Sequence, residues 1–163
     1  MIGVRFKEIP PVPDSLGFLD DARRAVPLVP GSEDDCCARL QRRTDVPDRE
    51  TARTWLTFLR ALELAEETDA GYARTDREVD REALAASFRD RVFGAAEVVS
   101  LLSDHPFTAA EAFEQFRPTV PQWERHRNPR TWEDDWAERV ERLLEWAALF
   151  GLAERTDAGY EAT

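Results

Sequence analysis

One short phrase occurs twice in the chain, and this repeat constrains the fold more than any other feature of the sequence. LAEETDAGYART occupies residues 64–75, and LAERTDAGYEAT occupies residues 152–163. Extended backwards without gaps, segment 54–75 aligns with segment 142–163, and nearly half of the positions are identical. Chance rarely produces such agreement, so we expect the two segments to have the same structure.

The shared letters TDAG indicate a turn between two short strands. Asp favours the start of a type I turn, and Gly supplies the left-handed residue that closes a three-residue hairpin loop. The phrase therefore predicts strands over Leu64–Thr68 and Tyr72–Thr75 in the first copy. It predicts strands over Leu152–Thr156 and Tyr160–Thr163 in the second copy.

An amphipathic helix precedes each predicted hairpin. Apolar residues recur at three- and four-residue spacing over 49–62 and over 136–150, which is typical of a helix with one buried stripe. Two earlier helices are predicted in each half. In the first half they span 15–26 and the segment from a cap at Ser32 to the break TDVP. In the second half they span 93–104 and a segment that begins with a capping box formed by Thr108 and Glu111. Each half thus reads helix, helix, helix, hairpin.

The run CCARLQRRTDVPDRETARTWLTFLRALELAEETDAGY, residues 36–72, resembles the core of a winged helix-turn-helix domain. Residues 93–163 resemble the same fold with a much longer turn. The resemblance implies a mainly α fold with short β-hairpin wings, present as a tandem pair. We expect an N-terminal winged-helix domain over 14–78, a linker helix over 79–92, and a C-terminal domain over 93–163 with a long loop at 117–130.

The resemblance implies contact with duplex DNA, because winged-helix proteins commonly place the second helix of the turn motif in the major groove. Segment 39–60 carries six bases and three acids, whereas segment 131–163 carries nine acids and three bases. Phosphates would repel the second segment. We therefore expect a transcription-associated regulator whose first half binds DNA. The DNA-binding residues expected are Arg42, Arg43, Arg49, Arg53, Thr57, Arg60 and Arg74.

A second interpretation stays open, because other winged-helix proteins use the fold only for protein contacts. On this alternative the chain is a protein-interaction or assembly module without DNA binding. In either case the acidic second half is suited to a protein partner or to a homodimer.

The segment RPTVPQWERHRNPR, residues 117–130, is basic within an acidic chain. One interpretation is a surface loop held to its domain by Trp123. The other is an arm that binds a phosphate group or a protein partner. The residues of that arm would be Arg117, Trp123, Arg125, Arg127 and Arg130.

The charge balance resembles that of proteins from extreme halophiles. There are 33 acidic residues against 22 basic ones, a formal net charge of -11, and Lys7 is the single lysine among the bases. Self-repulsion is tolerable in molar salt, where the Debye length is about 3 Å. The acidity then reflects the habitat and does not by itself exclude an anionic partner.

Several classes of protein are not expected from this sequence. Hydrophobic residues make up 42% of the chain, which is enough for a core. No apolar run approaches the roughly 20 residues that a membrane span needs. The first residues lack the apolar region of a secretory signal. We expect a cytoplasmic protein. There is no Gly-rich phosphate loop, no nucleophile–histidine grouping and no metal-ligand spacing. We therefore expect no enzyme, no cofactor and no metal.

Overall fold

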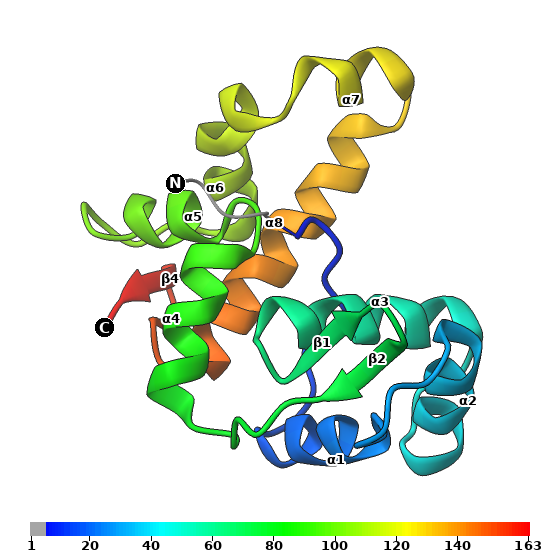
Figure 1. Ribbon diagram of the computed structural model, residues 1–163. Helices are drawn as coiled ribbons and strands as arrows, with labels where there is room; N and C mark the ends of the chain where they lie inside the picture. Colours follow the sequence, from blue (N-terminus) through cyan, green and yellow to red (C-terminus); the bar gives the residue numbers. More distant parts are fainter. Residues whose placement is uncertain (1–5) are drawn as a thin grey trace. The chain divides into compact units, whose positions relative to one another are not determined.

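The computed structural model describes residues 6–163 and forms two compact units, one ending at Val92 and the other beginning at Phe93. The first unit contains α1 (Gly17–Ala25), α2 (Glu33–Arg43), α3 (Arg49–Ala61), β1 (Ala65–Thr68), β2 (Gly71–Arg74) and α4 (Arg81–Arg91) (Figure 1). The second unit contains α5 (Ala95–Leu101), α6 (Ala109–Phe116), the 3-10 turn η1 (Arg117–Thr119), α7 (Gln122–Arg127), α8 (Trp132–Leu149), β3 (Ala153–Thr156) and β4 (Gly159–Ala162). The expected order of helix, helix, helix and hairpin is confirmed in both units.

Short polar side chains cap the first turns of α2, α3 and α6. Ser32 accepts a hydrogen bond from the backbone N–H of Asp35, and Asp48 accepts one from that of Thr51. Thr108 and Glu111 form the expected capping box at the start of α6. Each bond satisfies one of the N–H groups that a helix leaves unpaired at its first turn. Helix α8 begins at Trp132, earlier than predicted, because three acids in its first turn favour the positive end of the helix dipole.

The repeated phrase forms a hairpin in each unit, but the loop differs from the prediction. Thr68 pairs with Gly71, and Thr156 pairs with Gly159, so each loop holds two residues and the predicted three-residue loop is wrong. The reason is that the glycine pairs as a strand residue. In the first copy the Thr68 hydroxyl accepts from the N–H of Ala70 (3.1 Å) and donates to the carbonyl of Gly71 (2.9 Å), which holds the turn.

A third segment joins each hairpin through a single residue. Gly31 and Tyr72 exchange two backbone hydrogen bonds of 2.9 and 2.8 Å, and Phe107 and Tyr160 exchange two of 2.9 and 2.7 Å. A Cβ atom on Gly71 would lie 2.4 Å from the carbonyl oxygen of Gly31. The glycine of the repeated phrase is therefore required by this close backbone approach as well as by the turn.

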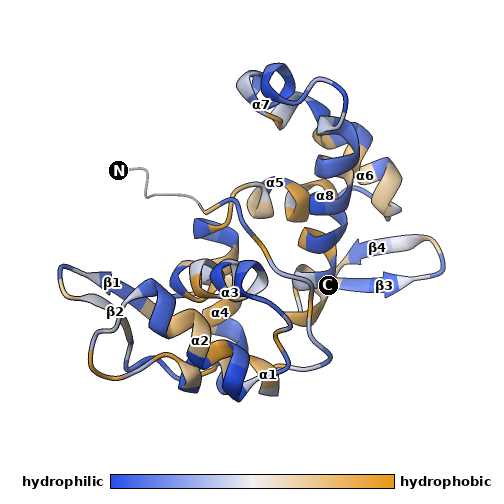
Figure 2. Ribbon diagram, turned by 90° about the vertical axis from the view of Figure 1, so that its right-hand side faces the viewer, coloured by the Kyte–Doolittle hydropathy of each residue, from blue (hydrophilic) through white to orange (hydrophobic). Residues whose placement is uncertain are grey.

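Each unit has its own apolar core. In the first unit it is built mainly on α3, whose Leu56, Phe58 and Leu59 are buried, and it includes the thiols of Cys36 and Cys37. In the second unit the core lies along one stripe of α8, with Trp136, Val140, Leu143, Leu144, Trp146 and Ala147 buried. Figure 2 shows the hydrophilic and hydrophobic colours alternating along α8, as one buried stripe requires.

Helix α4 corresponds to the linker helix expected over 79–92. Asp80 caps it by accepting from the N–H of Ala83, and its Ser87 and Arg91 contact Glu63, the residue that follows the carboxyl end of α3. The domain limits expected at residues 14 and 78 stay predictions. No helix among residues 6–163 has the length and apolar character needed to cross a membrane.

Candidate nucleic-acid interface

The turn between α2 and α3 is short and tightly bonded. The Thr44 hydroxyl donates to the carbonyl of Leu40 (2.6 Å) and accepts from the N–H of Val46 (3.3 Å), and the Val46 side chain is buried. Hydrogen bonds from Thr51 hold the pKa of the Asp48 carboxyl below its usual value. These contacts fix the direction in which α3 leaves the turn, and α3 is the helix expected to read DNA.

The first two outward arginines of α3 differ in their contacts. Arg49 forms ion pairs with Glu33 (3.8 Å) and Asp34, both at the start of α2. Arg53, one turn later, is exposed, and its side chain has no ion pair or hydrogen bond with the part of the chain that the structure describes. Arg53 is therefore the expected base-contacting arginine that stays available to a ligand.

Arg60, near the end of α3, is occupied by neighbours in its own unit. Its guanidinium lies 5.3 Å from the ring centre of Phe6 and 5.5 Å from that of Tyr72, and it pairs with Glu67 at 3.0 Å. Such contacts stabilise a guanidinium where it lies. Arg60 was expected to contact DNA, but its contacts hold it against its own wing and the N-terminal segment.

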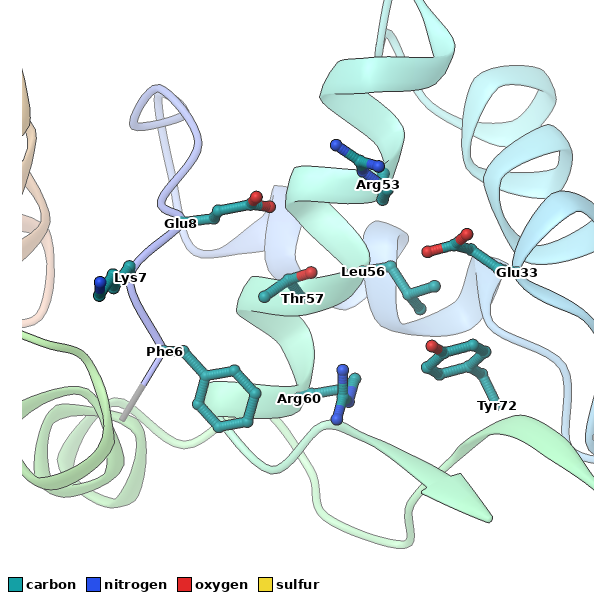
Figure 3. Close-up of a pocket in the computed structure, with 9 residues that line it drawn as sticks. All are labelled: Phe6, Lys7, Glu8, Glu33, Arg53, Leu56, Thr57, Arg60 and Tyr72. Atoms are coloured by element: carbon teal, nitrogen blue, oxygen red, sulfur yellow. The ribbon is translucent and has the colours of Figure 1, made fainter. Parts of the chain in front are cut away.

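The N-terminal segment runs beside α3. The N–H of Phe6 donates to the carbonyl of Arg91 (2.7 Å), and Ile9 and Pro10 are buried. A groove of about 430 Å³ lies between the segment and the helix, with Thr57 and Arg53 on the helical side and Glu33 near its rim. Figure 3 shows Phe6, Lys7 and Glu8 along one edge of this groove. Thr57, an expected DNA contact, thus faces another part of the chain.

The remaining expected contacts come from α2 and the wing. Arg42 and Arg43 end α2; both are exposed, and neither side chain has an ion pair or hydrogen bond within residues 6–163. Arg74 is part-buried, and it donates to the carbonyls of Val26 (3.1 Å) and Arg24 (3.0 Å). Arg42, Arg43 and Arg53 are accordingly the expected arginines whose side chains have no ion pair or hydrogen bond within residues 6–163.

The basic segment of the second unit is a helical insertion and not an open loop, since η1 and α7 lie within residues 117–130. The guanidiniums of Arg117 and Arg125 lie over the ring of Trp132, at 5.1 and 4.7 Å from its centre. Trp123, expected to hold the segment to the domain, is 51% exposed. Trp132 provides an aromatic contact for this segment, and the anchoring role expected for Trp123 stays a prediction. Only Arg127 and Arg130 of the expected arm are exposed arginines.

The two cysteine thiols of the first unit are buried. Burial raises the pKa of the Cys36 thiol to about 11 and also raises that of Cys37, which keeps both thiols protonated and poorly nucleophilic at neutral pH. No group of three or more His, Cys, Asp or Glu side chains in this part of the chain is arranged to hold a metal ion.

Sequence reasoning missed the residues that occupy the face of α3. Phe6, Glu33 and Tyr72 approach Arg49 or Arg60 from three separate segments. No periodicity or spacing links the three in the sequence. The one signal was the concentration of acids at the start of α2, which is also what the helix dipole alone would favour.

Comparison with known proteins gives one match. The family model described as "Halobacterial double winged helix domain" matches residues 4–163. No curated protein and no solved structure matches the chain. The match covers both units and agrees with the tandem arrangement and with the halophile-type composition.

Proposed function

Because the chain belongs to the halobacterial double winged helix family, we propose that it is a DNA-binding, transcription-associated regulator that contacts duplex DNA with its first unit. The contact surface comprises the end of α2 and the first half of α3. The second unit serves to bind a protein partner or a second copy of the chain.

The observation that carries this proposal is the exposure of three arginines, two before and one after the turn between α2 and α3. Arg42, Arg43 and Arg53 are exposed and unpaired within residues 6–163, although the chain as a whole carries a net charge of -11. Unpaired arginines in so acidic a protein are available to an anionic ligand. N-terminal positions of a recognition helix are those that reach base edges, and Arg53 has such a position.

A binding selection on random duplex DNA in molar potassium chloride tests the proposal. The wild-type chain is expected to enrich a defined sequence motif. A triple variant, with Arg42, Arg43 and Arg53 each changed to Gln, provides the nonbinding control. If the wild-type chain enriches no motif over that control, DNA contact is excluded under the conditions in which such a protein works.

An assembly module without DNA binding is the second candidate, and the position of the N-terminal segment favours it. Phe6 covers Arg60, and the same segment borders Thr57, so half of the helix face that would enter a major groove is occupied. A concentration-dependent dimer in sedimentation velocity, together with an empty DNA selection, would favour this candidate over the first.

A further inference from the structure

Arginines from three elements of the first unit surround the carboxyl end of α1. Arg74 of β2 donates from Nε to Val26 O and from Nη2 to Arg24 O, and Arg39 of α2 donates from Nε to Ala25 O at 2.7 Å. Three consecutive carbonyls are bound in this way. The residues called here the arginine cluster are Arg23, Arg24, Arg39, Arg43 and Arg74.

Capping of α1 accounts for only part of this cluster. The last carbonyls of a helix lack partners and favour nearby cations, which explains Arg39 and Arg74. Arg24 and Arg43 bind none of these carbonyls with their side chains. The Arg24 side chain is 68% exposed and pairs with Asp20 at 3.0 Å, and Arg43 is exposed without a partner in residues 6–163.

The charges of the other four arginines act on Arg74. Burial lowers the pKa of Arg74, and the charges of Arg23, Arg24, Arg39 and Arg43 lower it further. Within residues 6–163, Asp20 forms ion pairs with Arg23 (3.9 Å) and Arg24 (3.0 Å). Bringing like charges together costs free energy, and a bound anion offsets that cost.

We propose that the arginine cluster is a binding site for a phosphate group, carried either by a small phosphate compound or by a nucleic acid backbone. A guanidinium presents paired N–H donors that match two oxygens of a phosphate. Arg39 and Arg74 are fixed by the carbonyls that they cap, so their remaining donors are oriented before a ligand arrives. Arg24 and Arg43 complete the site from the solvent side. If the phosphate group belongs to a nucleic acid, the site rests on the DNA-binding function proposed above. If it belongs to a small compound, the site is independent of that function.

Pyrophosphate is a suitable probe, since it carries the phosphate chemistry without any base or sugar. Its binding to the full chain is measured by calorimetry at constant potassium chloride. In the double variant Arg24→Gln and Arg43→Gln, the dissociation constant is expected to rise about tenfold through the loss of charge-assisted hydrogen bonds. Both substitutions leave the capping side chains in place, so the fold of α1 is retained.

Arg89→Gln is the matched control. It removes the same charge from an exposed position on α4 of the same unit, outside the arginine cluster and outside the proposed DNA surface. Pyrophosphate affinity is expected to stay at the wild-type value in this variant. Equal weakening by Arg89→Gln, or no measurable binding to the wild-type chain, overturns the site. Equally tight binding of polyglutamate overturns the phosphate assignment and favours an acidic protein partner.

A competition experiment identifies whether the phosphate belongs to DNA or to a small compound. A labelled duplex that pyrophosphate displaces from the wild-type chain, but not from the double variant, assigns the cluster to backbone phosphates. Pyrophosphate binding without such displacement assigns it to a small compound. If the wild-type chain enriches a DNA motif but does not bind pyrophosphate, the cluster alone is contradicted. If it binds pyrophosphate but enriches no motif, the proposed function alone is contradicted.

Discussion

Glu63 and Gly151 follow equivalent helices, α3 and α8, and both adopt the left-handed backbone conformation, with φ of 64° and 78°. Glycine adopts this conformation readily, whereas a residue with a side chain loses about 1–2 kcal/mol. The cost at Glu63 is offset by its contacts, because its carboxylate accepts from Ser87 (2.7 Å) and Arg77 (3.0 Å) and forms an ion pair with Arg91 (3.1 Å). The first unit thus uses an acid where the second uses glycine.

Replacing Glu63 with Gln is expected to make stability less dependent on pH. The hydrogen bond from Ser87, with smaller contributions from Arg91 and Arg77, holds the pKa of Glu63 below its usual value. The stabilisation is therefore complete above the unfolded-state pKa and is lost as pH falls through the lowered folded-state pKa. Thermal unfolding at several pH values should show wild type and Glu63→Gln converging below about pH 4. A difference that stays constant well below that pH would contradict the role of this carboxylate.

Two variants separate the carboxylate from the backbone strain. Glu63→Ala and Glu63→Gly remove the same side-chain contacts, but glycine relieves the left-handed strain. We expect Glu63→Gly to be more stable than Glu63→Ala by about 1 kcal/mol in urea unfolding at neutral pH. Equal stabilities would mean that the chain relaxes at this position when the contacts are gone.

Gly71→Ala is expected to destabilise the first unit by roughly 2–4 kcal/mol, through overpacking and backbone strain. The new Cβ would meet the backbone of Gly31, and the φ of 130° at Gly71 is one that side-chain residues rarely adopt. Ala70→Gly, in the same exposed loop, is the control and should change stability far less. Urea unfolding in molar potassium chloride measures both, and similar values for the two would argue against the close contact with Gly31.

The repeat made the fold predictable, because an amphipathic helix followed by a turn sequence is specified by interactions between residues close in the sequence. The helices before each hairpin and the caps at Ser32 and Thr108 follow from such local rules. The loop length was not predictable in this way. It depends on the pairing of Gly71 with Thr68 and on the approach of Gly31, which is distant in the sequence.

The candidate site was less predictable than the fold, since the availability of an arginine depends on what surrounds it. Helical periodicity correctly placed Arg49, Arg53 and Arg60 on the outward side of α3. It carried no information on the ion pairs of Arg49 or on the aromatic rings around Arg60. The same limit explains why the contacts of Arg117 and Arg125 with Trp132 were not predicted.

Removal of salt is expected to unfold the chain. With a net charge of -11, acid–acid repulsion grows as the Debye length lengthens from about 3 Å at 1 M to about 10 Å at 0.1 M salt. Circular dichroism during dialysis from molar to millimolar potassium chloride should show loss of helix. Sucrose at matched osmolarity is the control and should not replace the salt. A chain that keeps its full helical signal at millimolar salt would refute the adaptation inferred from its composition.

The sharpest test of DNA recognition compares Arg53 in the first unit with Arg142 in the second. Arg53→Ala is expected to abolish sequence preference, because a bidentate contact between arginine and guanine contributes about 1–3 kcal/mol of discrimination. Backbone contacts gain little from counterion release in molar salt, so base contacts carry more of the specificity. Arg142→Ala, in the second unit, should leave the selected motif unchanged, since Arg142 pairs with Glu138 of its own helix at 3.0 Å.

Arg60→Ala distinguishes a folding role from a reading role on the same helix. Its guanidinium is held by Phe6, Tyr72 and Glu67, so its loss should lower stability by roughly 1–2 kcal/mol and leave the enriched motif intact. Binding selections give the enriched motif, and urea unfolding gives the stability, for the variants Arg53→Ala, Arg142→Ala and Arg60→Ala. If Arg60→Ala changes the motif while Arg53→Ala does not, the N-terminal segment must leave α3 when DNA binds, and the reading surface lies on the second half of the helix.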